Sequence, residues 1–165
     1  MEKARVLMID DNVALVRMVK EYFRSHAKID VVLEAYDGVE GLHLIESEMD
    51  CYDVIILDLI MPKKDGVSVL EEMQKKGIHK KVIVLTSYNT QEMIRKVSEL
   101  GIHYFILKPF ELDELARRVL ECTANNTFNQ KSIDLYQNNL DISITKILHE
   151  LGVPSHIKAV SYTHL

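Results

Sequence analysis

Cysteine is scarce in this sequence. Its two cysteines, Cys51 and Cys122, stand far apart among 165 residues and form neither a CxxC pair nor any other metal-ligand spacing. A disulfide framework needs several cysteines, and a structural zinc site needs closely spaced cysteines or histidines. The sequence therefore favours two free thiols in a reducing cytosol.

Long apolar runs are also missing. No uninterrupted apolar stretch approaches the roughly 20 residues that a membrane-spanning helix needs. The first five residues lead straight into an expected strand, without the basic and apolar regions of a signal peptide. We therefore expect a cytoplasmic protein with no membrane partner.

Positive charge is not in excess. The 20 lysines and arginines face 25 aspartates and glutamates, which gives a formal net charge of −5. A nucleic-acid-binding domain usually carries a basic surface, so the overall charge does not favour such a role. The hydrophobic fraction of 47% and the charged fraction of 27% are typical of a globular protein with one good core.

Short apolar runs alternate with helical patterns. Runs rich in valine, isoleucine and leucine predict strands over residues 4–9, 30–35, 53–57, 81–86 and 103–107. Continuous apolar runs are typical of strands that are covered on both faces, as in a parallel sheet. The alternation predicts an α/β fold, a doubly wound five-stranded parallel sheet with strand order 2-1-3-4-5.

Capping residues and glycines mark several of the expected helix ends. Asn89 followed by Glu92 has N-cap and N3 chemistry, which predicts a helix start just after residue 86. Gly77 and Gly101 are each followed by isoleucine, as at a Schellman-type helix end. These signals agree with the strand boundaries on either side.

Polar side chains follow four of the expected strands. Asp10 and Asp11 follow the first strand, Asp58 the third, Thr86 ends the fourth, and Lys108 follows the fifth. The carboxyl ends of parallel strands share one edge of a sheet, where ligands bind. Three acids, a hydroxyl and a lysine at that edge predict a site for a divalent metal and a phosphoryl group.

Each of these residues also has a simpler interpretation. An Asp-Asp pair after a strand is often only a helix N-cap with a favourable dipole interaction. Thr86 could be an ordinary strand end, and Lys108 a solvated charge before a proline. All five residues reaching one edge by chance is improbable, so the phosphoacceptor interpretation is favoured.

The motifs resemble the receiver domain of two-component response regulators. The resemblance rests on the acidic pair, on Asp58 followed by Met61-Pro62 and Asp65-Gly66, on Thr86, and on Lys108-Pro109-Phe110. It covers roughly the first 120 residues, the size of one ordinary domain. It implies a flavodoxin-like receiver domain over residues 1–123, with a commonly cis peptide bond between Lys108 and Pro109.

The resemblance also implies roles for the site residues. Asp58 is the phosphoacceptor, and Mg²⁺ is the cofactor, or another divalent cation in its place. Asp11 and Asp58 bind the cation directly, the backbone carbonyl of Ile60 adds a third ligand, and Asp10 acts mostly through water. Lys108 balances the charge of the phosphoryl oxygens.

Two residues are implied to respond to phosphorylation. Thr86 offers a hydroxyl that can move toward the new oxygens, and Phe105 occupies the position of a switch aromatic. An ordinary core aromatic is an equally good interpretation of Phe105 on residue type alone. The resemblance implies a phosphoacceptor that catalyses its own phosphorylation and dephosphorylation, and not an enzyme acting on another substrate.

The composition changes after residue 123. Residues 124–139 are polar and asparagine-rich, and they predict a linker. Residues 140–159 resemble the opening of the DNA-binding effector domain in the stage 0 sporulation protein A family, with an apolar stripe typical of an amphipathic helix. We expect only this helical fragment of the effector domain, with residues 160–165 as an artefactual tail.

The expected function follows from both resemblances. The protein accepts a phosphoryl group on Asp58 from a phosphohistidine on a sensor kinase or a histidine phosphotransfer protein. Phosphorylation could form a homodimer, and DNA would be bound only by the full-length form, to control sporulation. The donor, the DNA target and the cause of the truncation stay open.

Two rival functions belong to other classes. A haloacid-dehalogenase-type phosphatase also uses a strand-tip aspartate, Mg²⁺ and a lysine, but it needs an acid where this chain has Ile60. A receiver that works without phosphorylation, as a pure interaction module, would not need the acidic pair, Thr86 and Lys108.

Overall fold

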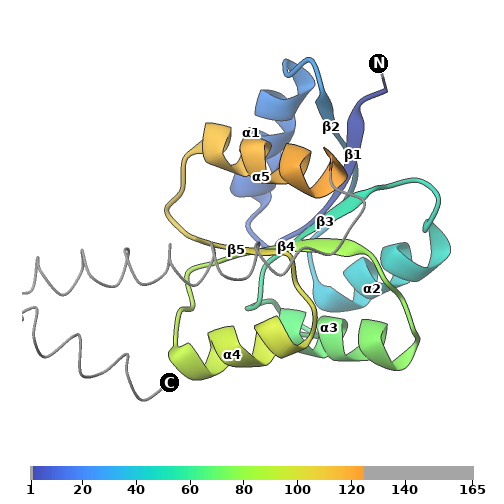
Figure 1. Cartoon of the computed structure of the whole chain (residues 1–165), viewed down its shortest axis with the longest axis vertical. Coiled ribbons are helices and arrows are strands. Elements are labelled where there is room, and N and C mark those ends of the chain that lie inside the picture. Colours follow the sequence, from blue (N-terminus) through green and yellow to red (C-terminus); the bar gives the residue numbers. More distant parts are fainter. Residues whose placement is uncertain (1, 125–165) are drawn as a thin grey trace, which may run out of the picture. The chain divides into compact units, whose positions relative to one another are not determined.

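The computed structural model describes residues 2–124 (Figure 1). The predictions for residues 125–165, which include the effector fragment, the tail and all but the first residue of the linker, lie outside the described residues; that first residue, Ala124, ends helix α5. Strands and helices alternate along the described chain in this order: β1 (Ala4–Ile9), α1 (Val13–Arg24), β2 (Ile29–Ala35), α2 (Gly38–Ser47), β3 (Val54–Leu57), α3 (Gly66–Lys75), β4 (Lys81–Thr86), α4 (Gln91–Glu99), β5 (Tyr104–Leu107) and α5 (Leu112–Ala124).

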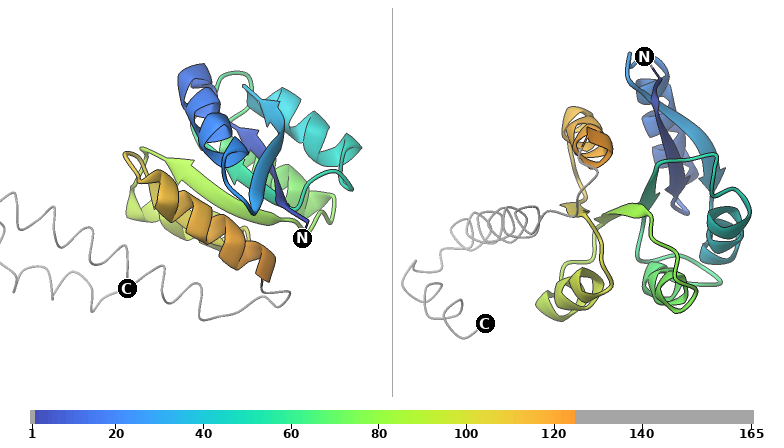
Figure 2. Two further views of the ribbon diagram at one scale, coloured as in Figure 1. Left: turned by 90° about the horizontal axis from the view of Figure 1, so that it is seen from above. Right: turned by 45° about the vertical axis from the view of Figure 1, so that its right-hand side comes forward.

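The strands form one parallel sheet in the order β2-β1-β3-β4-β5, which confirms the predicted topology. Helices α1 and α5 cover one face of the sheet, and α2, α3 and α4 cover the other (Figures 1 and 2). The chain direction is the same in every strand, so all strands end at one edge. This arrangement brings the residues that follow the strands together.

The inner strands are buried because helices cover both of their faces. All four residues of β3 are buried, as are the last four residues of β1. On the α1 and α5 face, the core continues into α5 through Leu115, Ala116, Val119 and Cys122. This spacing of one, four and seven residues is that of a single helix face. Burying each large aliphatic side chain contributes about 1.5–3 kcal/mol to the stability of the fold. The buried sheet therefore holds the ends of its strands in fixed positions.

The predicted helix ends are confirmed at the glycines and wrong at Asn89. The N-cap of α4 is Thr90, whose hydroxyl accepts a hydrogen bond from the backbone N–H of Met93. A capping side chain bonds the N–H three residues onward, and helix α4 begins at Gln91, one residue later than Asn89 would allow. Gly77 has φ of +66°, and the N–H of Ile78 donates to Met73 at 2.9 Å, as in a Schellman end.

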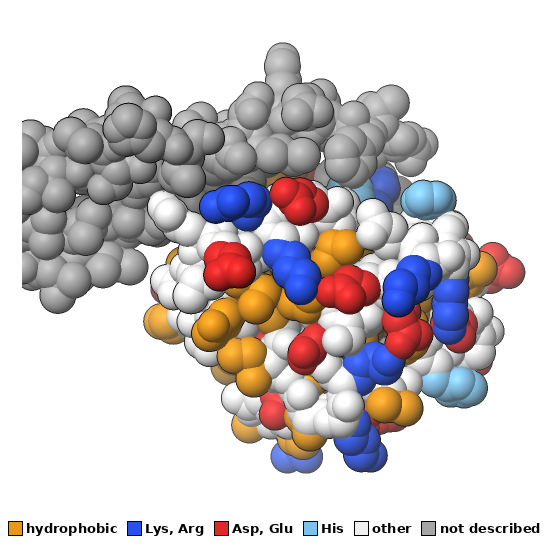
Figure 3. Space-filling view, turned by 90° about the horizontal axis from the view of Figure 1, so that it is seen from below, with side chains coloured by type: hydrophobic (Ala, Val, Ile, Leu, Met, Phe, Trp, Pro, Cys, Tyr) orange, Lys and Arg blue, Asp and Glu red, His pale blue; other side chains and the backbone are white. Residues whose placement is uncertain are grey.

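Helix α4 is the least firmly packed of the helices in residues 2–124. Val97 is its only fully buried residue. On the face made by α2, α3 and α4, acidic and basic side chains are interspersed (Figure 3). An ion pair joins Lys96 of α4 to Glu71 of α3 at 3.3 Å, and exposed pairs of this kind stabilise by less than about 1 kcal/mol. Little therefore opposes a small shift of α4.

Residues 2–124 contain both cysteines and all the helices that the structure describes. Cys51 is exposed and Cys122 is buried, and both are free thiols, as predicted. Burial raises the pKa of the Cys122 thiol to about 12, which makes it unreactive at neutral pH. No helix in this part of the chain is long and apolar enough to cross a bilayer.

Candidate functional site

Three carboxylates meet at the edge where the strands end. Asp10 and Asp11 follow β1, and Asp58 follows β3, its neighbour in the sheet. One oxygen from each carboxylate lies within 4.8 Å of the others. Asp10 is 1% exposed and Asp58 6% exposed, whereas Asp11 is open to solvent. The predicted acidic cluster is thus confirmed in position.

Backbone hydrogen bonds to neighbouring strands fix two of these residues. The N–H of Asp10 donates to the carbonyl of Ala35 at 3.1 Å, and the N–H of Asp58 donates to that of Ile9 at 3.0 Å. The acceptors are the last residues of β2 and β1. Each carboxylate therefore starts from a backbone position that the sheet itself determines.

Lys108 joins the cluster from β5. Its ammonium donates to Asp10 Oδ2 at 2.8 Å and to Asp58 Oδ2 at 3.2 Å. Its backbone N–H donates to the carbonyl of Thr86 at 2.9 Å, and the Lys108-Pro109 bond is cis, as the resemblance implied. The last residue of β4 therefore anchors the lysine whose side chain reaches across to the acids.

Burial and charge work against each other in this cluster. Burial raises the pKa of the Asp10 carboxyl, although hydrogen bonds from Lys108 and from the N–H of Asn12 oppose that rise. Burial also disfavours the Lys108 ammonium, but its bond to Asp10 and the nearby charge of Asp58 leave the pKa of Lys108 raised. The lysine therefore stays charged, and its one ammonium pairs with two of the three acids.

The donor set fits a divalent cation that prefers oxygen. Three carboxylates are within reach of one point, and a single ammonium neutralises only part of their charge. Mg²⁺ binds through one or two carboxylates and keeps several waters, which suits a cluster with one exposed acid. Receiver domains bind Mg²⁺ at an acidic site of this kind.

The remaining predicted residues lie around this cluster. Thr86 is buried at the end of β4, and its hydroxyl accepts from the N–H of Tyr88 at 3.3 Å. Ile60 has a side chain that is 54% exposed, and its N–H donates to Asp58 Oδ1 at 3.3 Å. Phe105 is buried in β5, where alternation turns it away from the core face that holds Ile106. The roles assigned to these residues stay predictions.

Gly66 is a positioning residue that the sequence analysis treated only as part of a motif. It is the first residue of α3, and its N–H donates to the carbonyl of Leu59 at 2.9 Å. A Cβ atom added at Gly66 would lie 2.2 Å from the carbonyl oxygen of Asp58, which is far inside contact distance. The absence of a side chain lets α3 pack directly under the strand tip. The only signal in the sequence was the glycine after Asp65.

Gly66→Ala is expected to lower both stability and phosphorylation. The new methyl group must push α3 away from the Asp58 backbone, and overpacking of this kind costs about 2–3 kcal/mol. Urea unfolding measures the first effect, and labelling by a small phosphodonor measures the second. Gly77→Ala is the control, because nothing lies within 4 Å of its added Cβ and only its φ of +66° is strained. Equal labelling of the two variants would contradict the positioning role.

The raised pKa of Asp10 predicts a pH effect on the metal-free protein. In the unfolded chain the carboxyl ionises near its ordinary pKa of about 3.9, whereas the folded form holds its proton to higher pH. The folded form then binds more protons, so its stability falls as pH rises through that window. Asp10→Asn has no proton to lose there. We expect its unfolding free energy in EDTA, relative to the unaltered protein, to grow as pH rises above about 4. A constant difference would contradict the raised pKa.

Comparison with known proteins agrees with this geometry. The chain matches the family model of the response regulator receiver domain over residues 6–120. It is 35% identical to the receiver domain of the Francisella response regulator 1452, with a TM-score of 0.65, covering 73% of this chain and 96% of that one. It is 27% identical to the signal receiver domain of NarL from Mycobacterium tuberculosis, with a TM-score of 0.70, covering 76% and 100%.

A third similar structure is a complex that carries ligands. The chain is 25% identical to a protein of the CheX–CheY–BeF₃–Mg²⁺ complex from Borrelia burgdorferi, with a TM-score of 0.67, covering 73% of this chain and 89% of that one. The matched family model spans more than half of the chain, and the strand order of the sheet agrees with the flavodoxin-like receiver fold. This chain therefore belongs to the receiver-domain family of two-component response regulators.

Proposed function

We propose that Asp58 accepts a phosphoryl group from a phosphohistidine and that this modification controls an effector. The observation that carries the proposal is the setting of Asp58: a carboxylate 6% exposed, 3.2 Å from the Lys108 ammonium and grouped with two further acids. A buried carboxylate beside a fixed cation is a preorganised nucleophile.

Phosphoryl transfer from the donor phosphohistidine to Asp58 needs no further reactant. A carboxylate oxygen of Asp58 attacks phosphorus, the bond from phosphorus to the donor histidine nitrogen breaks, and its electron pair stays on the imidazole. Lys108 lies where it can pair with a phosphoryl oxygen while the charge is redistributed. A divalent ion held by Asp11, Asp58 and the Ile60 carbonyl, with Asp10 reached through water, would neutralise the repulsion between the anions.

The response then passes through β4 and α4. The Thr86 hydroxyl accepts a hydrogen bond from the Tyr88 N–H, so its own proton is available for a new phosphoryl oxygen. A shift of Thr86 would pull on the chain that leads into α4, where only Val97 is fully buried. Phe105, on the neighbouring strand, would move with it. This change alters the surface used for dimerisation or for effector release.

The wider proposal is a regulator of sporulation initiation. It is supported by the resemblance of residues 140–159 to the opening of the effector domain in the stage 0 sporulation protein A family. The donor is a sensor kinase or a histidine phosphotransfer protein, and DNA is bound by the full-length form alone. The protein catalyses its own phosphorylation and dephosphorylation and acts on no other substrate.

Labelling with a small phosphodonor tests the core of this proposal. Acetyl phosphate with Mg²⁺ is expected to add one phosphoryl group, seen by intact-mass spectrometry, and EDTA is expected to prevent it. The label should be stable in acid and lost in base, as an acyl phosphate is. A protein that stays unlabelled by acetyl phosphate and by phosphorylated transfer proteins would be a phosphorylation-independent module instead.

The sporulation role needs a separate test. The genomic sequence that follows the codon for Ala159 is expected to encode a helix-turn-helix domain. Deletion of the gene in the source bacterium is expected to abolish spore formation, and Asp58→Asn in the chromosome should reproduce the deletion. Normal sporulation in both strains would leave the phosphoacceptor role intact and refute the sporulation role.

A further inference from the structure

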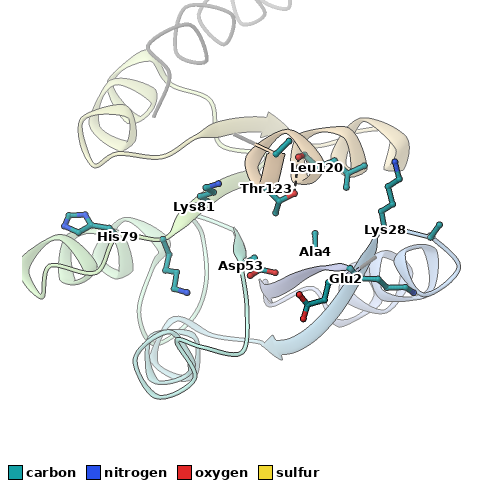
Figure 4. A pocket seen from close by; sticks show the side chains of 12 residues that line it. Glu2, Ala4, Lys28, Asp53, His79, Lys81, Leu120 and Thr123 are labelled. Atoms are coloured by element: carbon teal, nitrogen blue, oxygen red, sulfur yellow. Dashed lines mark hydrogen bonds between the residues drawn. The ribbon is translucent and has the colours of Figure 1, made fainter. Parts of the chain in front are cut away.

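A second candidate site lies at the opposite edge of the sheet, where the strands begin. A cavity of about 650 Å³ opens there between the start of β1, the loop before β2, the loop before β4 and the last turn of α5. This volume is within the range of small-molecule sites. Ala4 and Leu120 contribute apolar lining, Thr123 lies beside Leu120, and charged side chains surround them (Figure 4).

The charges around this cavity are mostly positive. Its lining includes Lys3, Lys28, Lys80 and Lys81, against the two acids Glu2 and Asp53. In Figure 4, Asp53 and Ala4 lie between Lys81 on one side and Lys28 on the other. The chain as a whole carries −5, so this positive cluster is a local exception that is not expected from composition.

One of the two acids already has a cationic partner. Asp53 accepts hydrogen bonds from the Arg5 guanidinium at 3.0 and 3.2 Å, in a bidentate ion pair. Arg5 and Asp53 each hold the other in place, so Asp53 is already paired with a cation that does not line the cavity. Glu2, on an exposed stretch before β1, is the remaining acid of the lining.

The four lysines of the lining differ in what they contact. Lys80 donates to the carbonyls of Met49 at 2.5 Å and Tyr52 at 3.2 Å, and its ammonium lies 4.6 Å from the Tyr52 ring centroid. Lys81 donates to the carbonyl of Cys122. The two carbonyls and the ring orient the Lys80 ammonium without cancelling its charge. Lys3 and Lys28 are exposed, and neither forms an ion pair with an acid of residues 2–124.

We propose that this cavity binds a small polyanion, a molecule with at least two phosphate or carboxylate groups. A concave site with low-dielectric walls focuses the field of its lysines, and charge-assisted hydrogen bonds to phosphate or carboxylate are the strong ones. The ligand would tie the start of β1 to the last turn of α5. It would do so at the edge of the sheet opposite to Asp58, so the two sites do not compete.

Titration of the full chain with pyrophosphate, followed by ¹⁵N NMR, tests this proposal. The protein is first passed over a chelating resin, which removes any metal that could bridge an anion to the acidic site, and sodium chloride keeps the ionic strength constant. Saturable shifts are expected for Ala4, Lys28, Lys81 and Thr123. A parallel titration with citrate shows whether the cavity prefers phosphate or carboxylate groups. Saturation at these amides by either anion supports the site.

Variants separate a built cavity from general attraction to lysine. The pair Lys3→Gln and Lys28→Gln is expected to weaken pyrophosphate binding at least about tenfold, since two charge-assisted contacts are lost. Lys75→Gln removes the same charge from an exposed position in α3 that does not line the cavity, and it should bind normally. Equal weakening by Lys75→Gln, shifts centred on Asp10 and Asp58, or no saturation would each overturn the proposal. Binding of a polyglutamate peptide without binding of either small anion would replace it with an acidic protein partner.

Discussion

Asp58→Asn is expected to reduce phosphoryl incorporation from acetyl phosphate to background. The amide keeps the shape of the side chain but offers no anionic oxygen to attack phosphorus. It also removes one of the two carboxylates that Lys108 contacts, at 3.2 Å, while the Asp10 contact at 2.8 Å remains. The fold should therefore persist. Intact-mass spectrometry in Mg²⁺ measures the loss, and circular dichroism checks the fold.

A matched control lies a few residues away. Asp65→Asn makes the same chemical change at an exposed carboxylate that caps α3, where asparagine also serves as an N-cap. We expect this variant to be labelled like the unaltered protein. Labelling of Asp58→Asn at the level of this control would show that the nucleophile is Asp10 or Asp11. A base-stable label would point to a different residue type altogether.

The fold was predictable because its signals are local and agree with one another. Continuous apolar strands, the glycine helix ends and the alternation of elements all indicate one parallel sheet, and β3 and β1 are buried as their sequences suggest. The one wrong helix end came from two adjacent residues with similar capping chemistry. Asn89 and Thr90 can both cap a helix, and in the structure it is the Thr90 hydroxyl that accepts from the N–H of Met93.

The site was predictable at the level of which residues meet, and not at the level of how they meet. Parallel topology alone brings Asp10, Asp58 and Lys108 to one edge. That Lys108 bonds both buried acids, and that its backbone is held by the Thr86 carbonyl, depends on distances across the four strands β1, β3, β4 and β5. The close approach of the Asp58 carbonyl to Gly66 likewise depends on how α3 packs against the strand end, which the sequence does not show.

Replacement of the exposed Asp11 is expected to have a large effect on Mg²⁺ affinity. Asp11→Ala should weaken Mg²⁺ binding at least about tenfold, because it removes the solvent-facing member of the three-carboxylate group. The metal-free protein should be as stable as before or slightly more stable, because one of three crowded negative charges is gone. The pairs that Lys108 makes with Asp10 and Asp58 do not involve Asp11, so the buried part of the cluster stays intact.

Asp50→Ala is the matched control for that change. It removes one exposed aspartate before β3, at the edge where the strands begin, so it changes net charge equally without touching the acidic cluster. Titration of both variants with Mg²⁺, followed by NMR shifts or by tyrosine fluorescence in this tryptophan-free chain, gives the two affinities. Reduced affinity in Asp11→Ala alone supports direct ligation by Asp11. An unchanged titration in Asp11→Ala would mean that Asp10 and Asp58 hold the ion by themselves, and a drop shared with Asp50→Ala would reduce the effect to long-range charge.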